Sequence, residues 1–361
     1  MKRIIAGVKP LAQFMDDGSF LMPEIPAVYR AMQALGCPAW VDYDYVLSIS
    51  GAAVRLTWQQ GWAAYDGPAN QNDLFFDGEE FTDVKLALER LGVSYTLRHA
   101  SDVGIDAAKR EIDESIDRGV PVLLTDRSVC VLGYDGDALL GISTFADQNK
   151  REAPHGYNRF NDLENEISAY FIIERYAPRE MNRRLLADTL GTAVKLATTA
   201  RIDKLGDTAL GISSFDALAE QLVWDESFEP LEPGKRYEGK ISFPCDRPEG
   251  YYREDGARTL ASRFWDGYCD FLCMLNGYSN FAQFLERYAG VVPEWHDKLF
   301  QAAKNYHAAC DYSGKLWQYV TPDDNGVAKF KDKDVRYAFA AHMLRAKIYT
   351  VRAVEILRQL A

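Results

Sequence analysis

The chain has 361 residues, of which 47% are hydrophobic and 12% aromatic, so it is long and apolar enough for about two domains with sizeable cores. Its formal net charge of −12 argues against a nucleic-acid partner. The sequence shows neither the ~7–15 apolar residues of a signal peptide at its start nor the ~20 of a membrane span elsewhere. We therefore expect a cytoplasmic protein that binds neither nucleic acid nor membrane.

The cysteines and histidines form no recognisable ligand set. None of the six cysteines stands in a CxxC pair, which predicts reduced, mostly buried thiols rather than disulfides. The five histidines are scattered, and neither an HExxH motif nor a Gly-rich phosphate loop occurs. We expect no metal and no cofactor.

The N-terminal half is predicted to combine helices and strands. After a first strand-like run, apolar spacing predicts helices over 26–36, 41–50, 82–92 and 105–119, and extended segments over 50–58, 93–100 and 167–176. The loop over 59–78 is rich in Gly, Asn, Asp and aromatic residues, and its length is typical of functional loops. A second, polar loop is predicted over 148–166.

The stretch 119–147 is the predicted centre of this half. Its three apolar runs, VPVLL, VCVLGY and ALLGIS, are separated by TDRS and DGD. Such runs bounded by Asp, Gly and Ser predict consecutive strands, and Asp135-Gly136 is a strong hairpin signal. We expect the central meander of an antiparallel sheet, in a domain that ends near Ala177.

The C-terminal half is predicted to be almost wholly helical. Helices are expected over 179–199, 214–224, 257–276, 281–288, 296–309 and 335–360, with a Pro- and Gly-rich loop over 225–255. The fold class is therefore α+β, with a domain over 1–177 built on an antiparallel sheet and an all-α helical domain over 178–361.

The order of these elements resembles the papain-like cysteine peptidases of the bacteriocin-processing type. A Gln-containing loop leads into the first helix, and the meander has a strand reading VCVLGYDGD. In that family a Gln stabilises the oxyanion six residues before the nucleophilic Cys, a His begins the GYD strand, and an Asp or Asn on the next strand orients it. A thiol needs such an imidazole, held by a third group, to become nucleophilic.

A closer resemblance covers nearly the whole chain. The segments SGAAVRLTW, GYDGDALLGIS, LGISSFDALAEQL and AAKNYHAA look like bacterial proteins related to the N-terminal domain of butirosin biosynthesis protein H. That relative is an acyltransferase that moves an acyl group from a carrier protein to an aminoglycoside. The resemblance implies a papain-like first domain and amide-bond or acyl-transfer chemistry.

The catalytic residues of the family carry over only in part. Gln13 matches the oxyanion glutamine, but the residue six positions later is Ser19, and alignment back from the helix end puts the nucleophile near Met22. The base position reads DRS, and the guanidinium of Arg127 stays protonated and cannot act as a base. Asp147 matches the orienting acid. His99 or His155 could approach Ser19 from elsewhere in the fold, and Cys130, inside the GYD strand, is expected to pack in the core.

A second group of residues suggests a ligand pocket. An arginine with aromatic and amide neighbours suits an anionic or amide-bearing small ligand; these residues are Arg55, Trp58, Trp62, Tyr65, Asn70 and Asn72, with Arg127 at the former base position. The alternative is structural: Arg55 pairs with a buried carboxylate, and the two tryptophans are core residues.

Two functions from different classes follow. The first is a catalytically degenerate papain-like protein that binds a small molecule, a peptide or an acyl-amine. The second is an active amide-bond enzyme, an acyltransferase or peptidase-like hydrolase, with a non-standard nucleophile. A third alternative makes the helical half a docking surface for a partner protein, and self-association into a homo-oligomer is left open.

Overall fold

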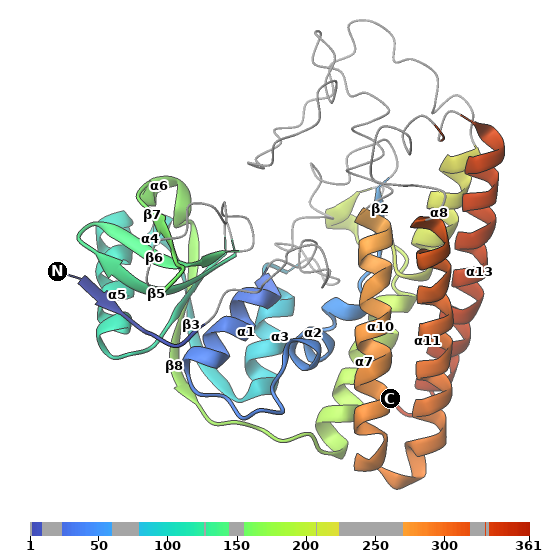
Figure 1. The fold of residues 1–361 in the computed structure, drawn as a ribbon, viewed down its shortest axis with the longest axis horizontal. Helices are drawn as coiled ribbons and strands as arrows, with labels where there is room; N and C mark the ends of the chain where they lie inside the picture. The colour runs from blue at the N-terminus through green and yellow to red at the C-terminus, as the bar shows by residue number, and fades with distance from the viewer. Residues whose placement is uncertain are drawn as a thin grey trace, which may run out of the picture. The chain divides into compact units, whose positions relative to one another are not determined.

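The computed structural model describes residues 2–8, 24–59, 79–125, 128–143, 155–206, 208–223, 270–317, 329 and 332–361. The chain divides into two compact units, in which unit 1 comprises residues 1–50 and 83–180, and unit 2 comprises residues 51–82 and 181–361 (Figure 1). Unit 1 carries a large antiparallel sheet, and unit 2 carries the long helices. The expected mixture of an antiparallel sheet with a helical C-terminal region is therefore confirmed.

The sheet of unit 1 has seven strands, each antiparallel to its neighbours. The strand order is β3-β8-β4-β5-β6-β7, and β1 pairs with the second half of β5. The strands are β1 Lys2–Ile4, β3 Val93–His99, β4 Val122–Leu124, β5 Val129–Asp135, β6 Ala138–Ser143, β7 Asn158–Phe160 and β8 Ala169–Tyr176. The predicted meander is thus β4, β5 and β6 at the centre of the sheet.

The turn between β5 and β6 follows from its sequence. Asp135 pairs with Ala138, so the loop is the two-residue Gly136-Asp137. Gly136 has φ +62°, in the left-handed region that glycine enters without steric cost. The predicted hairpin at this position is confirmed.

Helices accompany this sheet. They are α1 Glu24–Ala34, α2 Tyr43–Ser50, α3 Thr82–Leu91 and α5 Ile105–Asp117, with the single turns α4 Ala100–Val103 and α6 Leu163–Glu166. Ile112 of α5 belongs to a buried cluster with Val129 and Val131 of β5. Because successive strand residues point to opposite faces, Cys130 lies on the other face, where α1 packs against β4, β5 and β6.

Unit 2 is built on long helices packed against one another. They are α7 Arg183–Thr198, α8 Ile212–Val223, α10 Asp270–Tyr288, α11 His296–Trp317 and α13 Lys333–Leu357. The helix α11 packs against α10 and α13, and α13 also packs against α8. At the centre, the ring of Tyr306 lies 4.9 Å from Tyr278 and 5.3 Å from Phe281 between centroids, both edge to face. This geometry favours aromatic contacts and fixes the register of α10 on α11.

The structure differs from the prediction at two short strand pairings, β2 with β9 and β7 with β6. The segment predicted as extended over 50–58 begins with a 3-10 turn, Ala52–Val54, and only β2, Thr57–Gln59, is a strand. Its partner is β9, Thr208–Leu210, in a region predicted without strands. The predicted polar loop over 148–166 contains β7 and α6. Each missed strand has three residues, too few to show an alternating pattern.

Two helix ends also differ from the prediction. The helix α10 continues through Gly277, where a break was expected, and α11 runs to Trp317 instead of ending near residue 309. The Ser313 hydroxyl, in the part of α11 that was missed, donates to Asn276 Oδ1 at 3.0 Å and to the Leu272 carbonyl at 3.3 Å. Contacts between helices therefore stabilise helical structure at residues whose local sequence favours a helix end.

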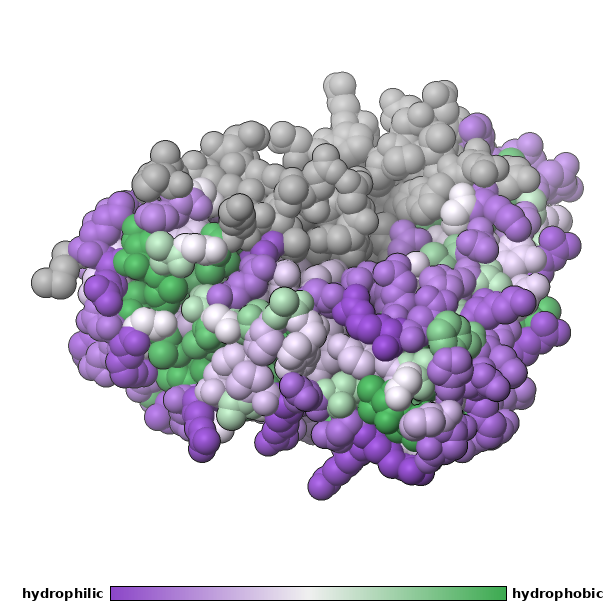
Figure 2. Space-filling view, turned by 60° about the horizontal axis from the view of Figure 1, so that its bottom comes forward, coloured by the Kyte–Doolittle hydropathy of each residue, from purple (hydrophilic) through white to green (hydrophobic). Residues whose placement is uncertain are grey.

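The surface of the described residues is largely hydrophilic. In the view of Figure 2, hydrophilic residues cover most of the described surface, and hydrophobic residues form smaller patches among them. No helix in the described part of the chain combines the length and apolarity needed to cross a membrane.

A histidine on α13 gives unit 2 a dependence on pH. Burial lowers the pKa of His342 below its usual 6.5, and the charges of Arg345 and Lys315 lower it further. Its ring centroid lies 5.7 Å from that of Tyr312 on α11. Because the unfolded chain takes up the proton first, the free energy of unfolding falls as the pH drops through the unfolded pKa and levels off below the folded one.

Replacing His342 by glutamine is expected to weaken this dependence. Urea unfolding at several pH values between about 7 and about 5 should show a smaller acid-induced loss of stability in His342→Gln than in the parent chain. His296→Gln, at the exposed start of α11, is the matched control and should retain the parental dependence. Parallel stability curves for the parent chain and His342→Gln would contradict this account.

Candidate functional site

Most of the predicted site residues lie outside the described residues. These are Gln13, Ser19 and Asp147 of the catalytic set, and Trp62, Tyr65, Asn70, Asn72 and Arg127 of the ligand set. Their predicted roles stay predictions. The described structure gives the elements beside them in the sequence and the positions of the remaining candidates.

A serine stands directly before β5, in the DRS stretch where the papain-like resemblance would place a histidine. Ser128 directly precedes β5, is buried, and has φ +51°, a conformation that non-glycine residues seldom adopt. Its backbone N–H donates to the Thr125 carbonyl at 3.1 Å. A hydroxyl is a poor proton acceptor at neutral pH, so this residue offers no general base.

The thiol of β5 is a core group. Cys130 is fully buried, and its cross-strand neighbours are Leu123 on β4 and Ile142 on β6. Burial raises the pKa of the thiol far above its usual value, and the positive charge of Arg30 on α1 offsets this only in part. Reactive cysteines have the opposite property, a lowered pKa and an exposed sulfur. The expectation that Cys130 packs in the core is confirmed.

Arg30 brings a buried charge to the same face of the sheet. It lies on α1 with its side chain buried, and its Nη1 donates to Gln33 Oε1 at 2.5 Å. Burial raises the pKa of Tyr157, Cys130 raises it further, and the Tyr157 hydroxyl donates to the Ile5 carbonyl at 2.8 Å. The face of the sheet beneath α1 therefore holds polar groups in fixed positions, and sequence spacing gave no sign of this cluster.

The other described thiols are also unactivated. The Cys37 sulfur lies 3.8 Å from the Val41 carbonyl, and the Cys310 sulfur lies 4.0 Å from Asn276 Oδ1. Burial is the main cause that raises the pKa of each thiol. All three are free cysteines. Within the described ranges, no three His, Cys, Asp or Glu side chains are grouped in a way that could hold a metal ion.

Two members of the predicted ligand set lie in unit 2. Arg55, just before β2, and Trp58, within it, are each 5% exposed. The Trp58 indole N–H donates to Gln221 Oε1 at 2.8 Å, and its ring meets Phe271 edge to face at 6.1 Å. The neighbouring Thr57 hydroxyl contacts Met274 Sδ at 3.7 Å. Trp58 thus joins β2 to α8 and α10, as expected from the structural alternative.

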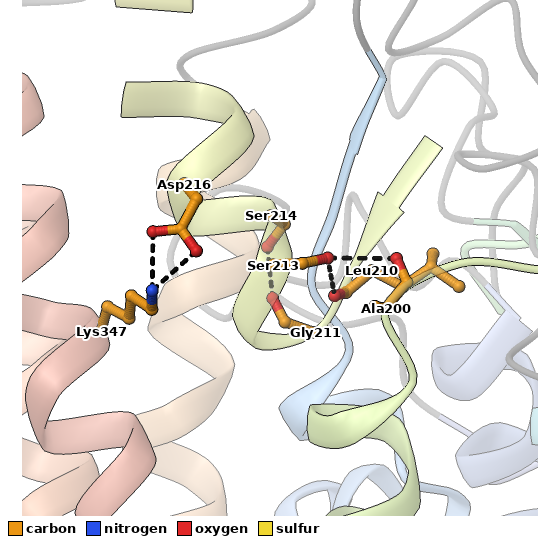
Figure 3. A network of polar contacts seen from close by, with 7 residues as sticks. All are labelled: Ala200, Leu210, Gly211, Ser213, Ser214, Asp216 and Lys347. Atoms are coloured by element: carbon orange, nitrogen blue, oxygen red, sulfur yellow. Dashed lines mark hydrogen bonds and ion pairs between the residues drawn. The ribbon is translucent and has the colours of Figure 1, made fainter. Parts of the chain in front are cut away.

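The segment LGISSFDALAEQL has a structural role. Gly211 has φ +54°, and a Cβ there would lie 2.4 Å from the Leu196 carbonyl oxygen, so only glycine fits between β9 and α8. The Ser213 hydroxyl donates to the Leu210 carbonyl at 2.8 Å, and the Ser214 hydroxyl to the Gly211 carbonyl at 2.6 Å (Figure 3). One turn later, Asp216 accepts from Lys347 of α13. These contacts fix the start of α8 and its position on α13.

The comparisons with known proteins leave the site to be argued from its own residues. No protein-family model and no curated protein matches this chain.

Proposed function

We propose that the chain is a papain-like-fold protein of the butirosin biosynthesis protein H-like kind, in which cysteine chemistry has been lost and the fold binds a small molecule, a peptide or an acyl-amine. The observation that supports this proposal most directly is that β5 and the residue before it offer neither a base nor a reactive thiol. A serine stands immediately before it, and its one cysteine is fully buried with a raised pKa.

The arrangement of α1 and β5 supports the papain-like part of the proposal. A nucleophile placed before a helix can be activated only if that helix lies against the strand that carries the base. In this chain, α1 follows the segment that contains Gln13 and Ser19, and it packs on β5, which follows Arg127. The scaffold is thus compatible with a papain-like centre, although the sequence lacks its thiol and imidazole.

Binding uses the polar groups that remain at this centre. The cationic Arg127 replaces the base, and a guanidinium donates two parallel hydrogen bonds to a carboxylate. Asn70 and Trp62 form a separate candidate group of amide and aromatic side chains on unit 2, where Arg55 is a buried cation. Trp58 is buried and bonded to Gln221, so it is not assigned to the ligand. The ligand class is therefore a small carboxylate or amide.

The loss of catalysis is tested with covalent probes on the native chain. We expect neither a fluorophosphonate nor iodoacetamide to label Ser19, and Cys130 to react with iodoacetamide only after urea unfolds the protein. Intact-mass and peptide mass spectrometry measure both. Stoichiometric labelling of Ser19 by the fluorophosphonate in the native chain, abolished by Ser19→Ala, would instead support the active amide-bond enzyme.

Binding is tested with N-acetylated dipeptides as probes. Saturation-transfer NMR on the full chain should detect a bound subset, and Arg127→Ala should weaken that binding about 10-fold or more, the usual effect of losing a hydrogen bond to a charged group. Arg184→Ala, on the exposed surface of α7, is the matched control and should bind as the parent does. Equal binding by the two arginine variants would refute the role of Arg127.

A further inference from the structure

Most of the exposed hydrophobic residues of unit 2 lie on the packed helices α8 and α13. Among the described residues, six large hydrophobic side chains are exposed, and four belong to α8 and α13: Val223 at 44%, Tyr337 at 41%, Leu344 at 40% and Ile348 at 51%. Single exposed hydrophobics are common on protein surfaces. Four of six on one pair of packed helices require a specific explanation.

The spacing on α13 is that of a helix-pairing seam. Tyr337, Leu344 and Ile348 are separated by seven and four residues, the exposed Ala341 lies between them, and the half-exposed Val351 continues the repeat. Steps of three and four residues place side chains along one stripe and are typical of two-stranded helix packing. The opposite side of α13 is already buried against α8 and α11. The stripe is therefore a second apolar face that the core of unit 2 does not use.

Two contacts define the acidic side of this stripe. Near one end, Arg336 Nε donates to the Leu222 carbonyl at 3.2 Å, and towards the other Lys347 Nζ pairs with the Asp216 carboxylate at 2.6 Å (Figure 3). The helices α8 and α13 therefore run antiparallel, and the exposed Glu220 lies between these contacts on α8. Because Asp216 is already paired with Lys347 and Arg336 is buried, Glu220 supplies the exposed negative charge of this side.

The other side of the stripe is basic. Arg345 and Arg352 are exposed. Arg345 follows Leu344 by one position, which turns it off the stripe on the side away from Lys347. The Arg352 guanidinium lies 5.5 Å from the ring centroid of Tyr349, which itself stacks on Tyr312 of α11 at 5.9 Å, so Arg352 borders the α11 side. Lys315 of α11 adds a third positive charge there, close enough to influence His342. The apolar stripe is thus bordered by negative charge on the α8 side and by positive charge on the α11 side.

We propose that the occupant of this stripe is a second copy of the same chain, paired through α13 about a two-fold axis with the two α13 helices parallel. In that arrangement the basic side of each copy faces the acidic side of the other, so Arg345 meets the partner's Glu220. An antiparallel pair would instead place arginine against arginine and glutamate against glutamate. The parallel pair also stacks Leu344 on Leu344 and Ile348 on Ile348, as an isologous interface requires.

The apolar part is tested by sedimentation equilibrium of the full chain. We expect the parent to show a monomer–dimer equilibrium, and Leu344→Glu/Ile348→Glu to raise the dimer Kd by at least about 30-fold, the effect of losing one interface hot spot. Circular dichroism checks that the variant stays folded, which is expected because both positions are exposed. Val103→Glu, at an exposed hydrophobic of unit 1, is the matched control and should dimerise as the parent does.

Charge exchange tests the parallel orientation. Glu220→Arg and Arg345→Glu should each weaken the dimer, and the double variant should restore it, because only the parallel pair brings these two positions together. A parent chain that is monomeric at every accessible concentration would overturn the dimer. A dimer that survives Leu344→Glu/Ile348→Glu would overturn this interface, and failure of the double variant to recover would overturn the orientation.

Discussion

Gly277→Ala is expected to destabilise unit 2 by about 1–3 kcal/mol, although alanine is the better helix former. A Cβ at this position of α10 would lie 2.6 Å from the carbonyl oxygen of Ala53. That carbonyl belongs to the 3-10 turn Ala52–Val54, which is held by backbone hydrogen bonds from Val54 to Gly51 and from Arg55 to Ala52. Neither backbone can yield without breaking its own bonds, so overpacking outweighs the ~0.5–1 kcal/mol gained in helix propensity.

Gly314→Ala is the matched control for this prediction. Gly314 lies in the long helix α11, and a Cβ there would meet nothing within 4 Å. The same substitution should therefore stabilise the protein by about 0.5–1 kcal/mol. Urea unfolding followed by circular dichroism measures both, and two variants with the same sign of change would rule out the close approach of α10 to Ala53.

The sequence predicts most of the sheet because its signals are local. In the meander, the residues that make the β5–β6 turn stand between the strands they join, and Gly136 has the positive φ that its position implies. The helices α1, α2, α3 and α5 likewise carry apolar spacing within their own length. Local chemistry of this kind needs no knowledge of the rest of the fold.

The missed elements depend on partners far away in the chain. The pair β2–β9 joins Thr57–Gln59 to Thr208–Leu210, so neither strand is identifiable from its neighbours. Gly277 looks like a helix stop in sequence, yet it is present because Ala53 needs the space. The sequence alone does not distinguish a glycine that ends a helix from a glycine that allows another backbone segment to approach closely.

The same limit applies to the candidate site. Sequence spacing correctly indicated that Cys130 is a core residue, because it lies within an apolar strand. The buried Arg30 on α1 was not anticipated, because an arginine in an amphipathic helix is ordinarily exposed. For Trp58 the sequence allowed both a pocket and a core role, and its bond to Gln221, 163 positions away, decides between them.

Trp58→Ala should therefore cost about 3–5 kcal/mol of unfolding free energy, the usual loss for a buried tryptophan. Trp58→Phe keeps most of the volume but leaves Gln221 Oε1 buried without its indole donor, at a cost of about 1–3 kcal/mol. If that hydrogen bond is the cause, Gln221→Leu in the Trp58→Phe background should recover much of the loss, because removing both partners leaves no polar atom unpaired. Trp295→Phe, at a half-exposed tryptophan whose ring contacts Arg183, is the matched control and should change stability little. Urea unfolding measures all four variants. A tryptophan whose loss left stability intact but abolished dipeptide binding would instead belong to the ligand site, and the β2 segment would then be pocket lining rather than core.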